Sequence, residues 1–349
     1  MSTPRQTLEQ LLQRLDLSEA QAAELMSMLA APDLAPAMAG ALLTALRMKG
    51  VTADEVRGLA AAMRQLARKL ILPGTSDPVD AIDIVGTGGD ASGSFNLSTG
   101  AAMLAAACGL PVVKHGNRGI SSRSGSADLL EALGFALPLE ETRAAECFAA
   151  TGFTFLFAPY FHPAMKALAP IRAALGIRTV FNLLGPLTNP VPLRFLLAGA
   201  YNAETAELMA GTLAGMRMER AWVVHGAAGW DEATPIGPFL AFDVAAGQAR
   251  RLQIDPEELG IARCQPAELC GGDANRNLAA LVDVFEGRDR GAHLEALVLQ
   301  CGLSLMIAGR APSMSAGIAA ARAGLESGKA RAWLARLREF ANAPLRGIP

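Results

Sequence analysis

Three loops rich in glycine, serine and asparagine follow one another between residues 82 and 134, and short apolar segments separate them. Residues 81–85 form an apolar run that ends in glycines, which is typical of a buried strand. Residues 98–108 and 127–133 have small and apolar residues at helical spacing, and 111–113 indicate a second strand. The repeated order of strand, loop and helix predicts a parallel sheet. Ligands of such sheets bind beyond the carboxyl ends of the strands, where these loops lie.

The residues of the three loops suit a phosphate group. Glycines in loop 86–90 let backbone N–H groups approach an anion closely, because no Cβ intervenes. Segment 96–99 stands at the start of a predicted helix, where free N–H groups and the helix dipole favour negative charge. Segment 114–118 adds a lysine and an arginine, and 121–126 adds four serines before another helix. The spacing matches neither a Walker loop nor the dinucleotide-binding fingerprint.

These loops resemble those of the anthranilate phosphoribosyltransferases, a family of tryptophan biosynthesis. The resemblance covers most of the chain, and its motifs are long and specific. It rests on Ile82-Asp-Ile-Val-Gly-Thr-Gly-Gly-Asp90, Asn96-Leu-Ser-Thr99, Lys114-His-Gly-Asn-Arg118, His162-Pro-Ala-Met165, Arg172, Leu175-Gly-Ile-Arg-Thr179, Phe181-Asn-Leu-Leu-Gly-Pro-Leu-Thr-Asn-Pro190, His225-Gly226 and Asp231-Glu232.

The resemblance implies a Mg²⁺-dependent transfer of phosphoribosyl from 5-phosphoribosyl 1-pyrophosphate (PRPP) to anthranilate, with release of pyrophosphate. Three alternatives stay open. The same chemistry on another aromatic amine is compatible with the motifs. A pyrimidine nucleoside phosphorylase shares the architecture, but the Lys-His-Ser-Thr-Gly-Gly type of segment is absent. A non-catalytic, nucleic-acid-binding relative is expected to be basic and to lack the acid pair.

The resemblance also implies the residues of each subsite. Gly86, Asn117, Arg172, His115 and His162 are expected at anthranilate. The residues expected to bind PRPP are Gly86, Gly89, Asp90, Ser94, Asn96, Leu97, Ser98, Thr99, Lys114, His115, Gly116, Asn117, Arg118, Gly119, Ile120, Ser121, Ser122 and Ser126. No residue is assigned as a certain acid, base or nucleophile, because the aromatic amine is already neutral at pH 7.

Asp231 and Glu232 are adjacent acids that follow a predicted buried strand at 221–224. Taken alone, such a pair is more often a solvated turn. Beside a pyrophosphate, however, two hard oxygen ligands suit Mg²⁺, which keeps waters and bridges to phosphate. Together with the phosphate loops, the pair therefore predicts a metal site, and the resemblance adds Ser98 on the metal side.

Three further side chains each carry two interpretations. Arg172 is either a surface or paired arginine, or the residue that binds the anthranilate carboxylate in bidentate fashion. Arg178, six residues on, is the position most easily confused with it. His115 and His162 are either structural hydrogen-bonding residues or part of the acceptor pocket.

The N-terminal region is predicted to be helical. Ser18 with Gln21, and Thr52 with Glu55, form capping-box patterns ahead of the apolar helical runs 22–29 and 56–70. The apolar residues of segment 71–79 follow neither the spacing of a helix nor that of a strand, and we interpret this segment as a hinge. We therefore expect a helical domain over 1–72, joined by helices from about 162–190.

The α/β domain is expected over 73–349. It should contain a mostly parallel central sheet flanked by helices. The hairpin at 239–254 is read as an excursion from that sheet. Apolar residues of the N-terminal helices, such as Leu42 and Leu46, exceed what one short bundle needs to bury, so a homodimer through this domain is expected.

Composition excludes several classes. The net charge of −2 is close to zero, so the chain lacks the excess of positive charge that is typical of nucleic-acid-binding proteins. Five cysteines without a C-x-x-C pair suit a reducing cytosol. No apolar run is long enough to cross a bilayer, and the N-terminus lacks a signal-peptide core, so a cytoplasmic location is expected.

The sequence departs from the family pattern at three places. Arg276 stands where glutamate is expected, and Gln300-Cys301-Gly302 stands where Asn-Ala-Ala is usual. Trp230 is bulky for the loop that carries the acid pair. These departures bear on the identity of the acceptor.

Overall fold

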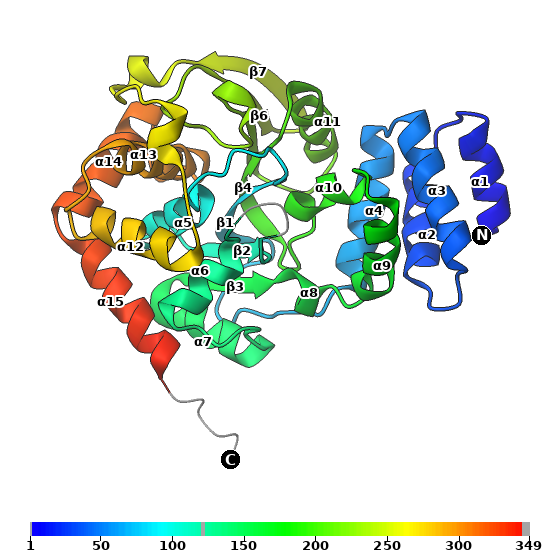
Figure 1. Cartoon of the computed structure of the whole chain (residues 1–349), viewed down its shortest axis with the longest axis horizontal. Coiled ribbons are helices and arrows are strands. Elements are labelled where there is room, and N and C mark those ends of the chain that lie inside the picture. The colour runs from blue at the N-terminus through cyan, green and yellow to red at the C-terminus, as the bar shows by residue number, and fades with distance from the viewer. Residues whose placement is uncertain (1, 120–122, 344–349) are drawn as a thin grey trace.

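A computed structural model describes residues 2–119 and 123–343. The chain forms an N-terminal group of helices beside a larger body built on one central sheet (Figure 1). The predicted fold class, a small helical domain with a mostly parallel α/β domain, is confirmed. No helix in the described ranges combines the length and the apolar character that crossing a membrane requires.

The strands form one seven-stranded sheet in the order β3-β2-β1-β4-β5-β6-β7. The first five strands are parallel to one another, whereas β6 pairs antiparallel with β5, and β7 pairs antiparallel with β6 at the edge. Their bounds are β1 Val79–Gly86, β2 Val112–Gly116, β3 Phe153–Phe157, β4 Leu193–Gly199, β5 Arg220–His225, β6 Phe239–Ala245 and β7 Gln248–Ile254.

Helices surround this sheet and form the N-terminal unit. The unit contains α1 Pro4–Leu12, α2 Glu19–Ala30, α3 Pro36–Lys49 and α4 Ala53–Leu66. The remaining helices are α5 Leu97–Ala107, α6 Ser126–Leu133, α7 Glu141–Thr151, α8 Ala158–Phe161, α9 Met165–Leu175, α10 Phe181–Leu184, α11 Ala203–Ala214, α12 Ala274–Phe285, α13 Ala292–Ile307, α14 Met314–Glu326 and α15 Lys329–Asn342.

Alternate residues of the central strands belong to two separate hydrophobic cores. On β4, Phe195 and Leu197 join the core that contains α5 and α13. Leu196 and Ala198 point to the other face and join the core that contains α11 and the N-terminal helices. Because side chains alternate along a strand, each central strand is covered on both faces, and this explains its nearly continuous apolar sequence.

The N-terminal helices begin where the capping patterns predict. Ser18 accepts a hydrogen bond from the backbone of Gln21, and Thr52 accepts one from the backbone of Glu55. Residues from α9 and α10, including Leu168, Phe181 and Leu184, pack into the same core as these helices. Figure 1 shows α9 and α10 next to α4. The segment around 162–190 therefore contacts the N-terminal unit.

Two sequence-based boundaries need correction. The helix expected to run to Leu70 ends at Leu66, because the backbone turns extended at Ala67 and Arg68 N–H then bonds to the carbonyl of Phe161. The hairpin at 239–254 is not an excursion. It extends the main sheet, since β6 pairs with β5 along its whole length.

The close packing of α2 on α4 generates a stability prediction. A Cβ added at Gly58 would lie 2.1 Å from the carbonyl oxygen of Glu19 in the α2 backbone. Gly58→Ala should therefore push the helices apart and lower the free energy of unfolding by about 1–3 kcal/mol. Chemical denaturation measures this change.

Gly211→Ala is the matched control, because its Cβ would meet only the Ala53 methyl at an ordinary 3.7 Å. Helix propensity alone should make that variant neutral or more stable by roughly 0.5–1 kcal/mol. Equal effects of the two substitutions would contradict the packing argument.

Candidate functional site

The candidate site lies where the strand order changes direction. β1 is flanked by β2 on one side and by β4 on the other, so the crossovers on the two sides leave in opposite directions. Open α/β sheets bind ligands in the crevice at such a point. Here β1 ends at Gly86 and β4 ends at Gly199, and these two glycines are partners in register.

The loop after β5 crosses directly over this pair of glycines and carries Asp231. A Cβ at Gly86 would lie 2.3 Å from Asp231 Oδ2, and one at Gly199 would lie 1.5 Å from the Asp231 carbonyl oxygen. Only glycine leaves room for the loop at either position. Gly88 N–H donates to Asp231 Oδ2 at 2.6 Å, so the predicted phosphate loop and the predicted metal ligand are in contact.

Glu232 reaches the start of α5. Its Oε1 accepts a hydrogen bond of 3.0 Å from the backbone N–H of Ser98, in the first turn of that helix. Its Oε2 is buried and has no hydrogen-bond partner in the described part of the chain. The structure therefore brings together Ser98, Asp231 and Glu232, which were predicted as one metal site from positions far apart in sequence.

Lys114 lies beneath this group. Its ammonium is 2 % exposed and donates to the carbonyl of Ile84 at 2.5 Å and to Ser98 Oγ at 3.4 Å. Burial lowers the pKa of Lys114, while Asp83 and Glu232 oppose that shift. The lysine thus supplies positive charge from behind Ser98.

The three acids Asp90, Asp231 and Glu232 repel one another in a buried place. Burial and the charge of Asp90 raise the pKa of Asp231 to about 7. Burial, followed by Asp231 and Asp90, raises the pKa of Glu232 well above its usual range. A bound cation would relieve this repulsion.

The donor set fits Mg²⁺ shared with phosphate better than a closed protein site. Within 2–119 and 123–343, no group of three His, Cys, Asp or Glu side chains is placed to hold a metal by itself. Mg²⁺ commonly takes one or two carboxylates, with waters and substrate phosphate completing its shell. Asp231, Glu232 and the hydroxyl of Ser98 are suitable oxygen donors for such a site.

Segment 90–97 is tied to the start of α12. Asp90 accepts hydrogen bonds from the backbone and side chain of Ser92, and from Asp231 N–H. Asn96 accepts a hydrogen bond of 2.7 Å from the Asn277 amide, and Gly272 N–H donates to Asn277. The segment 271–277, which leads into the first turn of α12, therefore positions Asn96.

The third loop is anchored around α6. Gly119 and Gly125 both donate backbone N–H groups to Asp128 Oδ2. A Cβ at Gly116 would lie 2.2 Å from Ser126 Oγ, so the loop end and the helix start are in close contact. Arg118 is paired with Glu131 and lies 4.9 Å from the Phe157 ring centroid.

Several of the residues predicted to bind PRPP therefore lie around one end of the sheet, but the structure does not describe all of them. Ile120, Ser121 and Ser122 lie outside the described residues. Thr99 and Leu97 are buried in the first turn of α5, while Asn117 is exposed beside Arg118. Ser94 lies in an isolated antiparallel bridge with Cys270.

Asp83 and Asn189 form a buried link that the sequence-based assignment missed. The Asn189 amide donates to Asp83 Oδ2 at 2.9 Å and to the carbonyl of Val113, and His115 N–H points at the same carboxylate. Burial raises the pKa of Asp83 to about 6. A lone acid inside the apolar run 81–85 was the sequence signal for this residue.

His115 and His162 lie against each other, with ring centroids 5.0 Å apart. Burial, and for His115 also the neighbouring His162, lowers the pKa of His115 to about 3, and burial lowers that of His162 to about 4. Both rings are therefore neutral at pH 7. His115 Nδ1 lies 3.3 Å from the Gly185 carbonyl, whereas neither nitrogen of His162 has a hydrogen-bond partner among the described residues.

The two arginines differ in their surroundings. Arg172, on α9, lies over the Phe181 ring at 5.2 Å from its centroid and has no ion pair within the described residues. Arg178 donates to the carbonyl of Gly89 and lies over the Tyr201 ring at 4.1 Å. Arg172 is thus a half-buried cation without an anion, whereas Arg178 already supports the glycine loop.

The three departures occupy different places. Arg276 is exposed in the first turn of α12. Trp230 is buried in the main core, and its carbonyl accepts a hydrogen bond of 2.8 Å from Gly226, so its bulk anchors the loop. Gln300 is buried and lines the same small cavity as Asp231 and Glu232.

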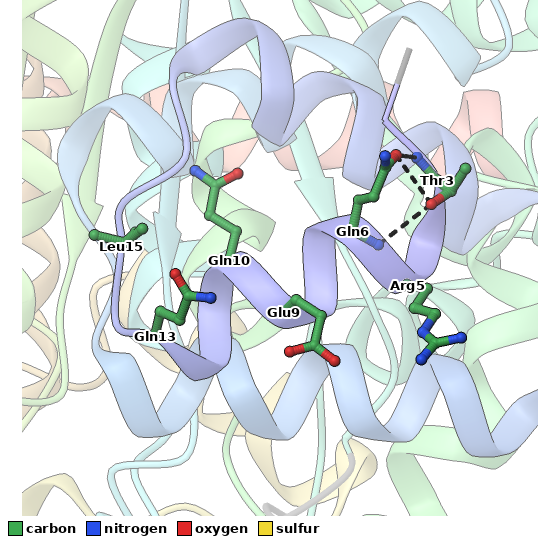
Figure 2. Close-up of a pocket in the computed structure, with 7 residues that line it drawn as sticks. All are labelled: Thr3, Arg5, Gln6, Glu9, Gln10, Gln13 and Leu15. Atoms are coloured by element: carbon green, nitrogen blue, oxygen red, sulfur yellow. Dashed lines mark hydrogen bonds between the residues drawn. The ribbon is translucent and has the colours of Figure 1, made fainter.

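The surface also has a shallow hollow on the outer side of α1, lined by polar residues and Leu15 (Figure 2). Figure 2 shows the Thr3–Gln6 capping contacts at one end of it. All of its lining residues fall within residues 3–15, so it contains none of the predicted substrate or metal residues.

Two family models match the chain. A model described as the a/b domain of a glycosyl transferase family matches residues 78–331, and one described as its helical bundle domain matches residues 5–67. Together they span the N-terminal helical unit and the central sheet.

Individual relatives agree with this assignment. Anthranilate phosphoribosyltransferase of Rubrobacter xylanophilus is 44 % identical over 92 % of both chains, and that of Methylobacterium nodulans is 46 % identical over 88 % of this chain and 89 % of the relative. The crystal structure of the Thermus thermophilus enzyme superimposes with a TM-score of 0.89 at 42 % identity, covering 97 % of this chain and 99 % of that one.

The Saccharomyces cerevisiae enzyme in complex with PRPP and Mg has a TM-score of 0.86 at 27 % identity, over 97 % of both chains. These matches support the phosphoribosyltransferase interpretation over the phosphorylase and nucleic-acid-binding alternatives. The chain belongs to the anthranilate phosphoribosyltransferase family.

Proposed function

We propose that this protein transfers the phosphoribosyl group of PRPP to the amine of anthranilate, in tryptophan biosynthesis and in the cytoplasm. The bond between ribose C1 and the pyrophosphate oxygen breaks, the bond between C1 and the amine nitrogen forms, and the amine loses a proton. The observation that carries the proposal is the meeting of Asp231 and Glu232 with the glycine loop and the start of α5. The relatives reported above support it.

The chain's own residues would bind and orient the donor. Backbone N–H groups of loop 86–90 and of the α5 start face the place where Asp231 and Glu232 gather, and they suit phosphate oxygens. Bound Mg²⁺ would supply charge stabilisation on the leaving pyrophosphate. Asp231, Glu232 and Ser98 would hold that ion, and Lys114 would add charge from behind.

The acceptor would lie on the side of Gly86, Asn117 and the two histidines. Because His115 and His162 are neutral at pH 7, they offer an uncharged aromatic wall. Arg172 would pair with the anthranilate carboxylate, since it is half-buried over the Phe181 ring and forms no ion pair in the described chain. Orientation, with no strong base, would then supply the catalytic advantage.

We further propose that the chain divides into two domains at about residue 72. We also propose that it forms a homodimer through the N-terminal helical unit. Leu42 and Leu46 cannot form the contact, because both are buried in the core of their own chain. The exposed large apolar residues of α1–α4 and the loops between them are instead Leu12, Leu15, Met48 and Leu66, with Met48 71 % exposed. A second copy of the chain would cover them.

Removing both acids tests the metal assignment. Asp231→Asn with Glu232→Gln should reduce turnover by about two orders of magnitude or more, the usual cost of losing a charge clamp. Because the variant also removes buried repulsion, its melting temperature at pH 8 without Mg²⁺ should stay level or rise. Steady-state rates and thermal melts measure both effects. Full activity of the variant at low Mg²⁺ would refute the assignment.

Removing Arg172 tests the acceptor side. Loss of a charge-assisted contact costs about 1.5–3 kcal/mol, so Arg172→Ala should lower kcat/KM for anthranilate by roughly ten- to one-hundred-fold. PRPP binding should hardly change, and the slow use of aniline should be insensitive to the substitution. Fluorescence loss of anthranilate follows the reaction.

Arg178→Ala is the comparison variant, because Arg178 supports the glycine loop. It should weaken PRPP use more than anthranilate use. If Arg172→Ala harms PRPP binding as much as anthranilate use, Arg172 belongs to the donor side.

Charging the exposed apolar residues tests the dimer. Met48→Asp combined with Leu12→Asp should place unpaired charge in the interface and shift the protein towards the monomer in sedimentation experiments. Ile71→Asp is the control, since Ile71 is equally exposed but lies in the linker. A wild-type monomer at micromolar concentration, or dissociation by the control alone, would rule out this interface.

A further inference from the structure

Gln300 is a buried amide that the proposed site does not use. It lies on α13 and is 3 % exposed, and its Nε2 has no hydrogen-bond partner in the described part of the chain. Burying an amide without a partner costs stability, and a leucine would fill the position at lower cost. The presence of glutamine therefore calls for a polar group that its nitrogen can contact.

Helix packing directs Gln300 towards the acids. Leu297, one turn earlier on α13, lies so close to Gly100 of α5 that a Cβ there would meet it at 2.7 Å. Residues three apart share a helix face, so Gln300 lies on the side of α13 that faces α5. Ser98 and the Glu232 carboxylate lie at the start of that helix.

Gln300 and Glu232 line the same small internal cavity. Its volume is about 10 Å³, and Ser98, Asp231, Gly199 and Ile84 are among its other lining residues. Much of the remaining lining is apolar (Val85, Leu197 and Val224), so a water molecule, which needs roughly 10–15 Å³, would hydrogen-bond to the few polar side chains of the cavity. The buried atoms lacking a partner at this place are Gln300 Nε2, a donor, and Glu232 Oε2, an acceptor.

We propose that Gln300 is a positioning residue for Glu232: through one water in this cavity, its amide donates to the carboxylate oxygen that Ser98 does not hold. The two contacts fix the plane of the carboxylate and leave its remaining lone pairs for a divalent cation. Partners of this kind orient metal ligands in many sites. The inference rests on the proposed function only in taking Glu232 as a magnesium ligand.

Calorimetric titration of inorganic pyrophosphate into the full-length protein tests this role. Outer partners of metal ligands typically change metal affinity by roughly 10–100-fold. With Mg²⁺ present, Gln300→Leu should weaken pyrophosphate binding by roughly tenfold or more. With EDTA in place of Mg²⁺, wild type and variant should bind alike. The KM for anthranilate should not change.

Two further variants separate positioning from packing. Gln300→Asn keeps the amide and should stay much closer to wild type in Mg²⁺ than Gln300→Leu does. Cys301→Ala alters the next buried residue of α13, which does not line the cavity, and should leave the Mg²⁺ dependence intact.

The inference is overturned if Gln300→Leu loses affinity equally with and without Mg²⁺, if it loses none, or if Cys301→Ala has the same effect. It is also overturned if wild type shows no Mg²⁺-dependent pyrophosphate binding. Wild-type protein that binds pyrophosphate in a Gln300-dependent manner, yet leaves anthranilate unconsumed, supports the inference and refutes the proposed acceptor.

Discussion

The contact between the Asp231 loop and the glycine ends of β1 and β4 is the constraint on which the site depends. A side chain at Gly86 or Gly199 would occupy the place of Asp231. With glycine at both positions, the loop after β5 crosses β4 and reaches the phosphate-type loop after β1. The fold thus brings a pair of acids to the one point where the crossovers diverge and open a crevice.

This arrangement carries an electrostatic cost when no cation is bound. Burial and mutual repulsion raise the pKa values of Asp231 and Glu232, which means that their charged forms are disfavoured in the folded chain. Lys114, beneath Ser98, offsets part of that repulsion. Binding sites commonly hold such locally unfavourable groups, because the ligand supplies the missing interaction.

The proposed donor and acceptor sides of the site are both connected to Asp83, a buried residue of β1. Asp83 accepts hydrogen bonds from the backbone of His115 and from Asn189, and its charge also opposes the fall in the Lys114 pKa. Lys114 and His115 are consecutive residues of β2. This one strand therefore carries a residue of the proposed donor side and a residue of the proposed acceptor side. A disturbance at Asp83 would reach both Lys114 and His115, whereas Arg172 contacts the Phe181 ring and Arg178 contacts the glycine loop.

The sequence by itself determined much of the local structure. Apolar runs, capping boxes and glycine positions predicted most helices and strands, because local periodicity and turn chemistry decide them. The family motifs predicted a metal-side group that the structure does bring together at Asp231, Glu232 and Ser98. Only the tertiary structure decided which faces of those elements are free. It buried Leu42 and Leu46, joined β6 to β5, paired Asp83 with Asn189, and placed Gln300 beside Glu232. Each of these depends on contacts between residues distant in sequence, which no local pattern encodes.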